Sequence, residues 1–197
     1  MNVSPSFDQR PDTKNPLDYD AIVVGAGVSG LYQLHLLRQG GLKVCTFEAG
    51  SGVGGTWYWN RYPGARFDSE SWTYGYSFSQ ELLDEWDWSE HFSSQPENER
   101  YLNFVADKFD LRSNIQFNSK VIAAHYHDNS RSWTVQLEDG SRHTSRFLIT
   151  AIGILSAPTM PNINGMFFRS HGDWRHFGFE GKHNCCLINI VVRITRF

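Results

Sequence analysis

The chain has 197 residues, which allows one domain with a real core and part of a second. Its net charge of −3 gives no broad basic field, so we expect no nucleic-acid partner. It has no apolar run of about 18 residues and its N-terminus has no apolar signal core, so we expect no membrane partner and a cytoplasmic location.

The N-terminal segment, residues 1–18, is expected to be a flexible leader. Prolines at positions 5, 11 and 16 stand among polar residues there. Organisation begins at Tyr19, and residues 21–24 form a short β-branched apolar run that ends at a glycine. Such a run is typical of a buried parallel strand.

A glycine-rich turn and a helix are expected after this strand. Leu31, Leu34 and Leu37 recur at helical spacing, and Gly40-Gly41 is expected to end the helix. Residues 44–47 form a second apolar strand, which ends at Glu48. The order of strand, glycine turn, helix and strand predicts a βαβ unit.

The middle of the chain has less regular signals. Residues 50–68 are rich in glycine and aromatic side chains, so we interpret them as a structured loop, with a tight turn at Pro63-Gly64. Residues 80–90 are acidic and weakly amphipathic and are expected to present a solvated face. Residues 97–111 have apolar positions at helical spacing, which predicts a helix.

Alternating apolar residues predict four strands in the next part of the chain, at 115–117, 120–126, 132–137 and 142–150. Asp139-Gly140 is a hairpin signal between the last two. The whole pattern predicts an α/β fold.

The turn Gly25-Ala26-Gly27-Val28-Ser29-Gly30 has the G-x-G-x-x-G spacing of a dinucleotide-binding loop. The first glycine permits the tight turn, the second lets backbone N–H groups approach a pyrophosphate, and the third lets helix and strand pack closely. The helix N-terminus then favours the anion. Glu48 is the expected ribose partner. On this unit alone, FAD and NAD are equally good candidates, and a turn in an unrelated α/β protein is a minor alternative.

The segment from Gly54 to Ser71 separates FAD from NAD. It reads G-G-T-W-Y-W-N-R-Y-P-G-A-R-F-D-S-E-S. This run resembles the Baeyer–Villiger monooxygenases, which are class B flavoprotein monooxygenases. Flavin N-hydroxylases and dimethylaniline-type monooxygenases are similar in the glycine turn and a G-G-x-W, but not in the longer run. The resemblance extends from about Tyr19 to Pro161 and favours FAD.

This resemblance implies a Rossmann-like three-layer FAD-binding domain with a parallel sheet and a small β-meander, which is incomplete here. Family members bind FAD tightly and NADPH in a second domain. The implied activity is that of an FAD-dependent monooxygenase that uses NADPH and O₂. Through a peroxyflavin, it would insert oxygen beside the carbonyl of a small-molecule ketone.

The resemblance also implies roles for individual residues. The turn from Gly25 to Gly30 would hold the FAD pyrophosphate, and Glu48 the adenosine ribose. Further FAD-binding positions are those that line or approach the flavin, Gly55, Thr56, Trp57 and Tyr74, and the adenine-contacting backbone of Val121.

Three further residues would face the nicotinamide cofactor: Arg66, Phe67 and Asp68. Asp68 is the candidate catalytic residue, because it would orient an active-site arginine beside the flavin, and a carboxylate paired with arginine suits the stabilisation of a nearby anion.

Simpler explanations stay open for some side chains. Asp68 could cap a helix that begins at the next residue, since aspartate is a preferred N-cap. Trp86 and Trp88 are best explained as core residues. His125 and His127 share a strand face, but no third ligand is evident and the cysteines lack zinc spacing, so we predict no metal site.

The later sequence departs from the family pattern. Ala151-Ile152-Gly153 stands where the family has Ala-Thr-Gly, which deletes a hydroxyl near the cofactor. The family fingerprint F-x-G-x-x-x-H-x-x-x-W is echoed only by His171 and Trp174, with a shorter spacing. Residues 179–182 resemble the lead-in to the NADPH domain, but no glycine follows Gly181.

We therefore expect three parts: a leader at 1–18, an FAD-binding domain at 19–161, and at 162–197 a degenerate linker with the start of a missing NADPH domain. A truncated product, or a frame or intron-retention tail after about His183, would explain this ending. A partner chain could supply the missing domain.

Two functions follow from this sequence. The chain is an FAD-dependent monooxygenase of Baeyer–Villiger type that works with a reductase or partner chain, or it is a non-catalytic remnant that at most binds FAD. The second is the better fit to the isolated chain. An NAD-dependent dehydrogenase ranks third, because no Ser-Tyr-Lys or comparable catalytic set is present. The substrate and the oligomeric state stay open.

Overall fold

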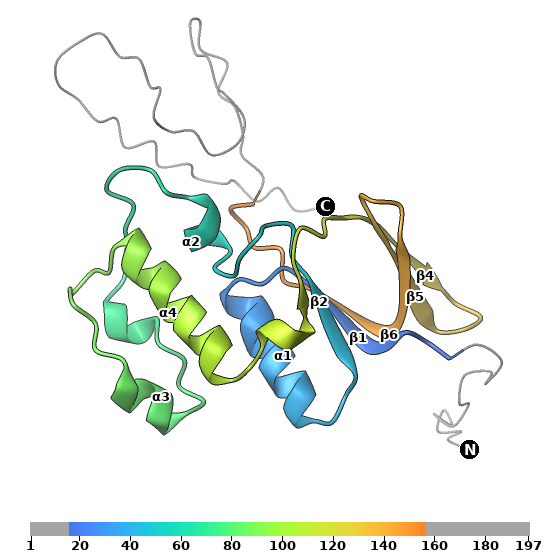
Figure 1. The fold of residues 1–197 in the computed structure, drawn as a ribbon, viewed down its shortest axis with the longest axis horizontal. Helices are drawn as coiled ribbons and strands as arrows, with labels where there is room; N and C mark the ends of the chain where they lie inside the picture. Colours follow the sequence, from blue (N-terminus) through green and yellow to red (C-terminus); the bar gives the residue numbers. More distant parts are fainter. Residues whose placement is uncertain (1–15, 157–197) are drawn as a thin grey trace, which may run out of the picture.

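The structure is a computed structural model that describes residues 16–156 (Figure 1). Its strands are β1 (Tyr19–Val24), β2 (Val44–Phe47), β3 (Ile115–Gln116), β4 (Val121–His127), β5 (Ser132–Leu137) and β6 (Arg142–Thr150). Its helices are α1 (Val28–Gln39), α2 (Thr56–Trp59), α3 (Gln80–Glu85) and α4 (Gln95–Lys108), with short 3-10 helices at Ser71–Thr73 and Arg112–Asn114.

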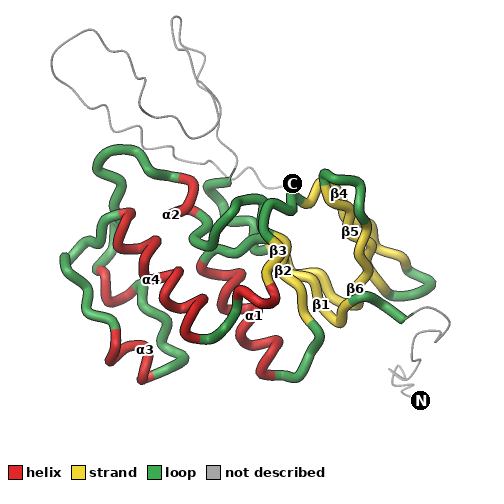
Figure 2. The backbone as a smooth tube through the Cα atoms, in the orientation of Figure 1, coloured by secondary structure: helices red, strands yellow, loops and turns green. Residues whose placement is uncertain are grey.

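The strands of the described residues form one sheet in the order β3-β2-β1-β6-β5-β4 (Figure 2). β3, β2, β1 and β6 are parallel, while β4, β5 and β6 form an antiparallel meander. The predicted parallel sheet and small β-meander are confirmed. β6 belongs to both, so the meander is a continuation of the sheet and not a separate one.

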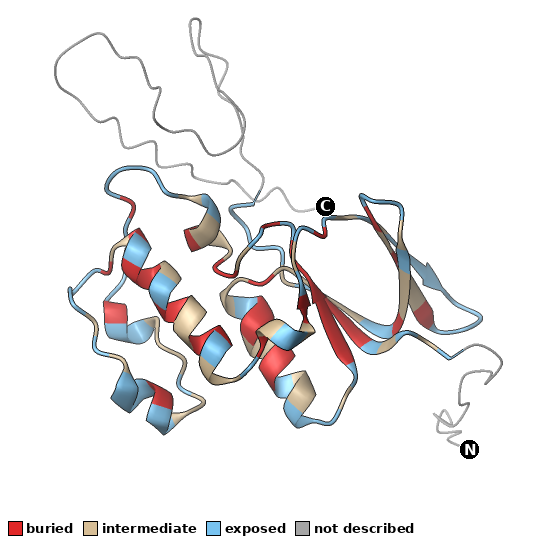
Figure 3. Ribbon diagram, viewed as in Figure 1, coloured by how far each residue is buried: buried red, intermediate tan, exposed pale blue. Residues whose placement is uncertain are grey.

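Two cores lie on opposite faces of this sheet and make a three-layer, Rossmann-like arrangement (Figure 3). The helix-side core combines alternate residues of β1 with the inner faces of α1 and α4: Ala21, Val23, Leu31, Leu34 and Leu102. The meander-side core combines the other residues of β1 and β2 with β5: Ile22, Cys45, Phe47, Val135 and Leu137. Since both faces of β1 and β2 are covered, these strands read as continuous apolar runs.

Most predicted elements are confirmed, and the differences have local causes. α4 begins at Gln95 and not at residue 97, because Pro96 suits the first turn of a helix. Residues 56–59 form the single helical turn α2, which was not predicted. The acidic stretch at 80–90 is not wholly a solvated face, since Leu82 of α3 is fully buried.

The core interpretation of the tryptophans is confirmed. Trp86 and Trp88 are half-buried and pack on Tyr101, with ring centroids 5.2 and 4.9 Å from the Tyr101 ring. By contrast, His125 and His127 lie on the exposed side of β4, where they line one shallow hollow together with Arg142.

Residues 1–15 and 157–197 lie outside the described part of the chain. The leader up to residue 15, the fingerprint remnants His171 and Trp174, and the predicted NADPH lead-in at 179–182 therefore fall there. Asp18, at the end of the expected leader, accepts hydrogen bonds from the Thr144 N–H and hydroxyl, both at 2.8 Å. Between residues 16 and 156, no helix has the length and apolar character of a membrane span, and no group of three or more potential ligands is placed to hold a metal.

Candidate functional site

The glycine turn lies at the carboxyl end of β1, between the ends of β2 and β6. The Gly25 N–H donates to the Phe47 carbonyl at 2.8 Å, and Gly25 has a φ of +100°, which a side chain would strain. A Cβ at Gly25 would also lie 2.6 Å from the Ala151 carbonyl oxygen of the segment after β6. This position therefore accepts only glycine.

The third glycine lets α1 approach the strand. A Cβ at Gly30 would lie 1.8 Å from the Gly25 carbonyl oxygen, so helix and turn touch through their backbones. The helix begins after Gly27, which offers no side-chain cap, and its first turn contains no acidic residue. The unpaired N–H groups of this first turn are thus left for an anion.

Glu48 stands at the end of β2 and is 4% exposed. One carboxylate oxygen accepts from the Ala26 N–H at 2.6 Å, and the other accepts from the Gly50 N–H at 2.7 Å. The carboxylate therefore holds the glycine turn and the following loop together. Each oxygen keeps a further lone pair, so a ribose hydroxyl contact is compatible with this arrangement.

The second glycine pair packs directly on the first turn. The Gly54 N–H donates to the Ala26 carbonyl at 3.0 Å. A Cβ at Gly55 would lie 2.8 Å from the Gly27 Cα, and Gly55 has a φ of +53°. The two glycine loops thus pack on each other through their backbones, and we call the pair the glycine cradle.

Three of the predicted cofactor residues form an aromatic wall, which we define as Trp57, Phe67 and Tyr74. The Phe67 and Tyr74 rings lie 4.3 Å apart, and each contacts the Trp57 ring at about 6 Å in an edge-on arrangement. The Trp57 indole N–H donates to the Tyr74 hydroxyl at 2.5 Å. Thr56 precedes Trp57 in α2 and is half-buried.

Arg66 and Asp68 flank Phe67 and are exposed. The Arg66 guanidinium pairs with the Glu90 carboxylate and donates to the Phe92 carbonyl at 2.9 Å. The capping explanation for Asp68 is wrong, because the 3-10 helix nearby begins at Ser71 and Glu70 occupies its N-cap.

Val121 opens β4 at some distance along the chain from the turn, but its segment runs beside Glu48. The Ser119 N–H donates to the Glu48 carbonyl at 2.8 Å, and the Asn118 N–H donates to the Gly50 carbonyl at 2.9 Å. The predicted adenine-contacting strand and the predicted ribose partner are therefore neighbours.

Two residues of this region were not predicted. The Gln95 side-chain amide donates to the Trp57 carbonyl and so fixes α2 on α4. The Tyr76 hydroxyl donates to the Val28 carbonyl at 2.6 Å, in the first turn of α1. Periodicity gave no signal for either residue, because Gln95 stands at the start of a helix and Tyr76 follows a turn.

Comparison with known proteins shows which proteins this chain is similar to. The family model of the NAD(P)-binding Rossmann-like domain matches residues 23–85. The 2-oxo-Delta(3)-4,5,5-trimethylcyclopentenylacetyl-CoA monooxygenase of Pseudomonas putida is 54% identical over 147 residues, which are 75% of this chain and 27% of that protein. A Baeyer-Villiger monooxygenase of Pseudooceanicola batsensis is 46% identical over 150 residues, which are 76% of this chain and 28% of that protein.

Solved structures agree with these relatives. The crystal structure of OTEMO in complex with FAD and NADP has a TM-score of 0.73 at 52% identity and covers 77% of this chain and 29% of its own. Over its matched residues, the chain is a Baeyer–Villiger monooxygenase homologue. It spans about a quarter of the length of the curated relatives that it matches.

One departure from the Baeyer–Villiger pattern lies at the edge of the cradle. Ile152, in place of the threonine of the family pattern, lies two residues after the end of β6, and its Cα would lie 3.7 Å from a Cβ at Gly25. Its side chain is 60% exposed. The substitution therefore places an apolar side chain in the open beside the glycine turn, and not in a core.

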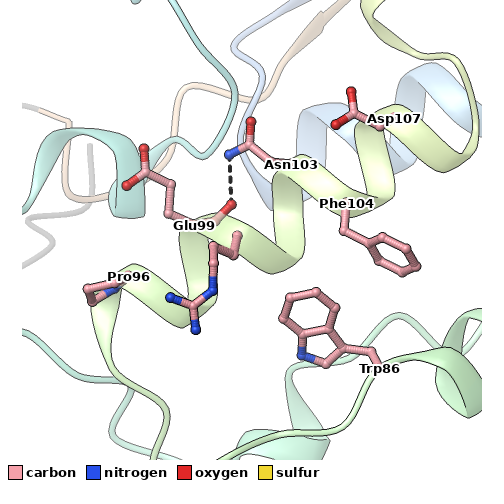
Figure 4. A pocket seen from close by; sticks show the side chains of 7 residues that line it. Trp86, Pro96, Glu99, Asn103, Phe104 and Asp107 are labelled. Carbon is pink, nitrogen blue, oxygen red and sulfur yellow. Dashed lines mark hydrogen bonds between the residues drawn. The ribbon is translucent and has the colours of Figure 1, made fainter.

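A hollow along α4 has a different lining (Figure 4). Trp86 and Phe104 face each other with ring centroids 5.4 Å apart, and the Asn103 amide donates to the Glu99 carbonyl at 2.8 Å. None of the candidate cofactor residues lines this hollow. The α4 hollow is therefore separate from the residues that were predicted to bind a cofactor.

Buried phenols behind the cradle predict an alkaline loss of stability. Burial raises the pKa of Tyr74 and of Tyr101 from 10.0 to about 12. The folded chain therefore holds these protons more tightly than the unfolded chain. The free energy of unfolding should be unaffected by them below pH 10 and should fall by about 1–2 kcal/mol for each phenol as pH rises to 12.

Urea unfolding at a series of pH values up to 12 measures this loss. Tyr101→Phe is the matched control, because it removes one buried phenol and leaves the other buried tyrosines and the lysines that also titrate in this range. The variant should show a shallower decline above pH 10. An equal decline in both proteins would contradict the assignment to buried tyrosine.

Proposed function

We propose that the cradle formed by the glycine turn and Gly54-Gly55 binds FAD. The observation that supports this most directly is the close backbone packing at Gly25, Gly27 and Gly30 at an uncapped helix start, whose first N–H groups are free to donate to a pyrophosphate. The solved relatives include a complex with FAD and NADP, and the VdtE relative of Byssochlamys spectabilis is named an FAD-binding monooxygenase. These names favour FAD over NAD at this turn.

Individual residues have separate tasks in this proposal. Ala26, Val28 and Ser29 present backbone to the pyrophosphate, Glu48 accepts from the ribose, and the backbone of Val121 meets the adenine. Gly55 and Thr56 line the flavin together with Trp57 and Tyr74 of the aromatic wall. We assign residues 19–161 to this FAD-binding domain.

The wider activity proposed is oxygen insertion beside the carbonyl of a small ketone, with NADPH and O₂. Bound FAD supplies the redox chemistry. Arg66 and Phe67 face the nicotinamide cofactor, and Asp68 positions an arginine from outside the described residues. Since this chain spans about a quarter of its relatives, the activity belongs to a longer protein or to an assembly with a partner chain.

Reconstitution tests the FAD step. The purified 197-residue chain is mixed with FAD, passed over a desalting column and examined by visible absorption. We expect flavin bands to remain with the protein, whereas FMN, which lacks the pyrophosphate-linked adenosine, should wash away. Loss of FAD, or retention of NAD⁺ instead, would contradict the proposal.

The second candidate function is non-catalytic FAD binding by the isolated chain. The observation that favours it is the exposure of Arg66 and Asp68, with Arg66 engaged by Glu90. An NADPH-oxidation assay of the FAD-loaded chain separates the two. Sustained turnover would support the monooxygenase by itself, whereas bound flavin without turnover supports the binding module.

A further inference from the structure

The first turn of α1 is connected to the aromatic wall by residues 74–76. Tyr74 accepts from Trp57 at one end of this segment, and the Tyr76 hydroxyl donates to the Val28 carbonyl at the other, at 2.6 Å. The Tyr76 N–H in turn donates to the hydroxyl of Tyr101 at 2.7 Å, and Tyr101 is 1% exposed on α4. The hydrogen bond between the Tyr76 backbone and Tyr101 of α4 therefore helps to fix the position of the Tyr76 side chain.

The carbonyl that Tyr76 contacts belongs to a particular peptide group. The Val28 carbonyl and the Ser29 N–H are the two ends of one peptide unit, and the Ser29 N–H is an unpaired donor of the first helical turn. A hydrogen bond accepted by the carbonyl polarises its peptide, so the N–H at the other end becomes a better donor. Gly27 provides no side-chain cap for the first turn of α1. The hydrogen bond from the Tyr76 hydroxyl to the Val28 carbonyl is therefore a side-chain contact that restrains this turn.

We propose that Tyr76 is a positioning residue for the pyrophosphate turn, acting through the Val28–Ser29 peptide. This inference rests on the proposed FAD binding. Tyr76 does not touch the cofactor itself; it orients and polarises one of the N–H groups that the pyrophosphate meets. Burial raises the pKa of Tyr76, so its hydroxyl stays protonated and remains a donor.

Tyr76→Phe tests the inference with little change in packing. The ring keeps its contacts with Tyr32, Phe78 and Tyr101, and only the hydroxyl is lost. We expect the Kd for FAD to rise about fivefold, the effect of one net hydrogen bond. The Ser29 amide proton resonance of the FAD-free chain should also move upfield, which a general loss of stability would not produce.

Tyr32→Phe is the matched control, because Tyr32 stacks on Tyr76 and its hydroxyl has no hydrogen bond in the described structure. It should leave both the Kd and the Ser29 resonance unchanged. Tyr101→Phe provides a second variant: it keeps the Tyr76 hydroxyl, loosens its backbone and should raise the Kd by less than Tyr76→Phe does.

The outcomes separate the inference from the proposed function. If the wild-type chain binds FAD and Tyr76→Phe binds it equally well, the inference is overturned and FAD binding stands. An equal loss in Tyr32→Phe would also overturn it, since packing alone would then explain the effect. If the wild-type chain does not bind FAD, the proposed function fails and the inference fails with it.

Discussion

Replacing Gly30 with alanine is expected to abolish FAD binding and to lower the free energy of unfolding by about 3 kcal/mol or more. The added Cβ would lie 1.8 Å from the Gly25 carbonyl oxygen and 2.9 Å from its carbon. Both atoms are backbone, so no side chain can rotate away. The helix must move off β1, which would misplace the N–H groups of its first turn.

Gly40→Ala is the matched control at the other end of α1. Gly40 has a φ of −72°, and a Cβ there would find its nearest atom, the Leu37 carbonyl oxygen, at 3.4 Å. We expect a change within about 1 kcal/mol and unaltered FAD binding. Urea unfolding and FAD titration of the two variants give the comparison. A Gly30→Ala protein that retains both stability and FAD would show that the close approach is not a constraint.

The fold was predictable from sequence where one signal dominates. β2, β5 and β6 were predicted with the bounds they have in the structure, because the continuous apolar run of β2 and the alternating patterns of β5 and β6 end at clear glycine or polar boundaries. α1 was predictable for the same reason, with leucines on one face and Gly40-Gly41 after it. Local pattern and tertiary packing agree in these elements, so a single sequence is enough.

The single helical turn α2 was not predictable from periodicity. Four residues are too few to show a helical repeat, and three of them are aromatic. Its position follows from two features outside its own sequence. The positive φ angles of Gly54 and Gly55 turn the chain just before it, and the Gln95 amide of α4 donates to the Trp57 carbonyl. The resemblance to a known family, and not the pattern, assigned Trp57 and Tyr74 to the FAD site, and the structure adds their mutual contact.

The candidate site was also predictable only in part. The turn from Gly25 to Gly30 and the position of Glu48 at a strand end were predictable, because spacing along the chain fixes them. The partners of the Glu48 carboxylate were not, since Ala26 and Gly50 reach it only after β1 and β2 pair. Sequence reasoning assigned this carboxylate to a ligand alone, and the structure adds a structural task.

Because Glu48 has both a structural role and a proposed role in FAD binding, its replacement should change both stability and FAD affinity strongly. Glu48→Ala should leave the Ala26 and Gly50 N–H groups without their buried acceptors. Each unsatisfied buried donor costs about 1–3 kcal/mol, so we expect the free energy of unfolding to fall by about 2–5 kcal/mol. FAD binding should be lost as well, because the turn and the loop after β2 are no longer held together.

Glu48→Gln separates the structural task from the ribose contact. The side-chain oxygen can still accept from one of the two N–H groups, but its NH₂ meets the other donor, so about half of the stability loss should remain. Glu138→Gln is a matched surface control, because Glu138 only pairs with Lys120 at an exposed position and should change stability by less than about 1 kcal/mol. Thermal unfolding and FAD titration of the three variants measure both tasks. If Glu48→Ala unfolds like wild type but no longer binds FAD, the carboxylate serves the ligand alone, and the two backbone contacts contribute nothing to the fold.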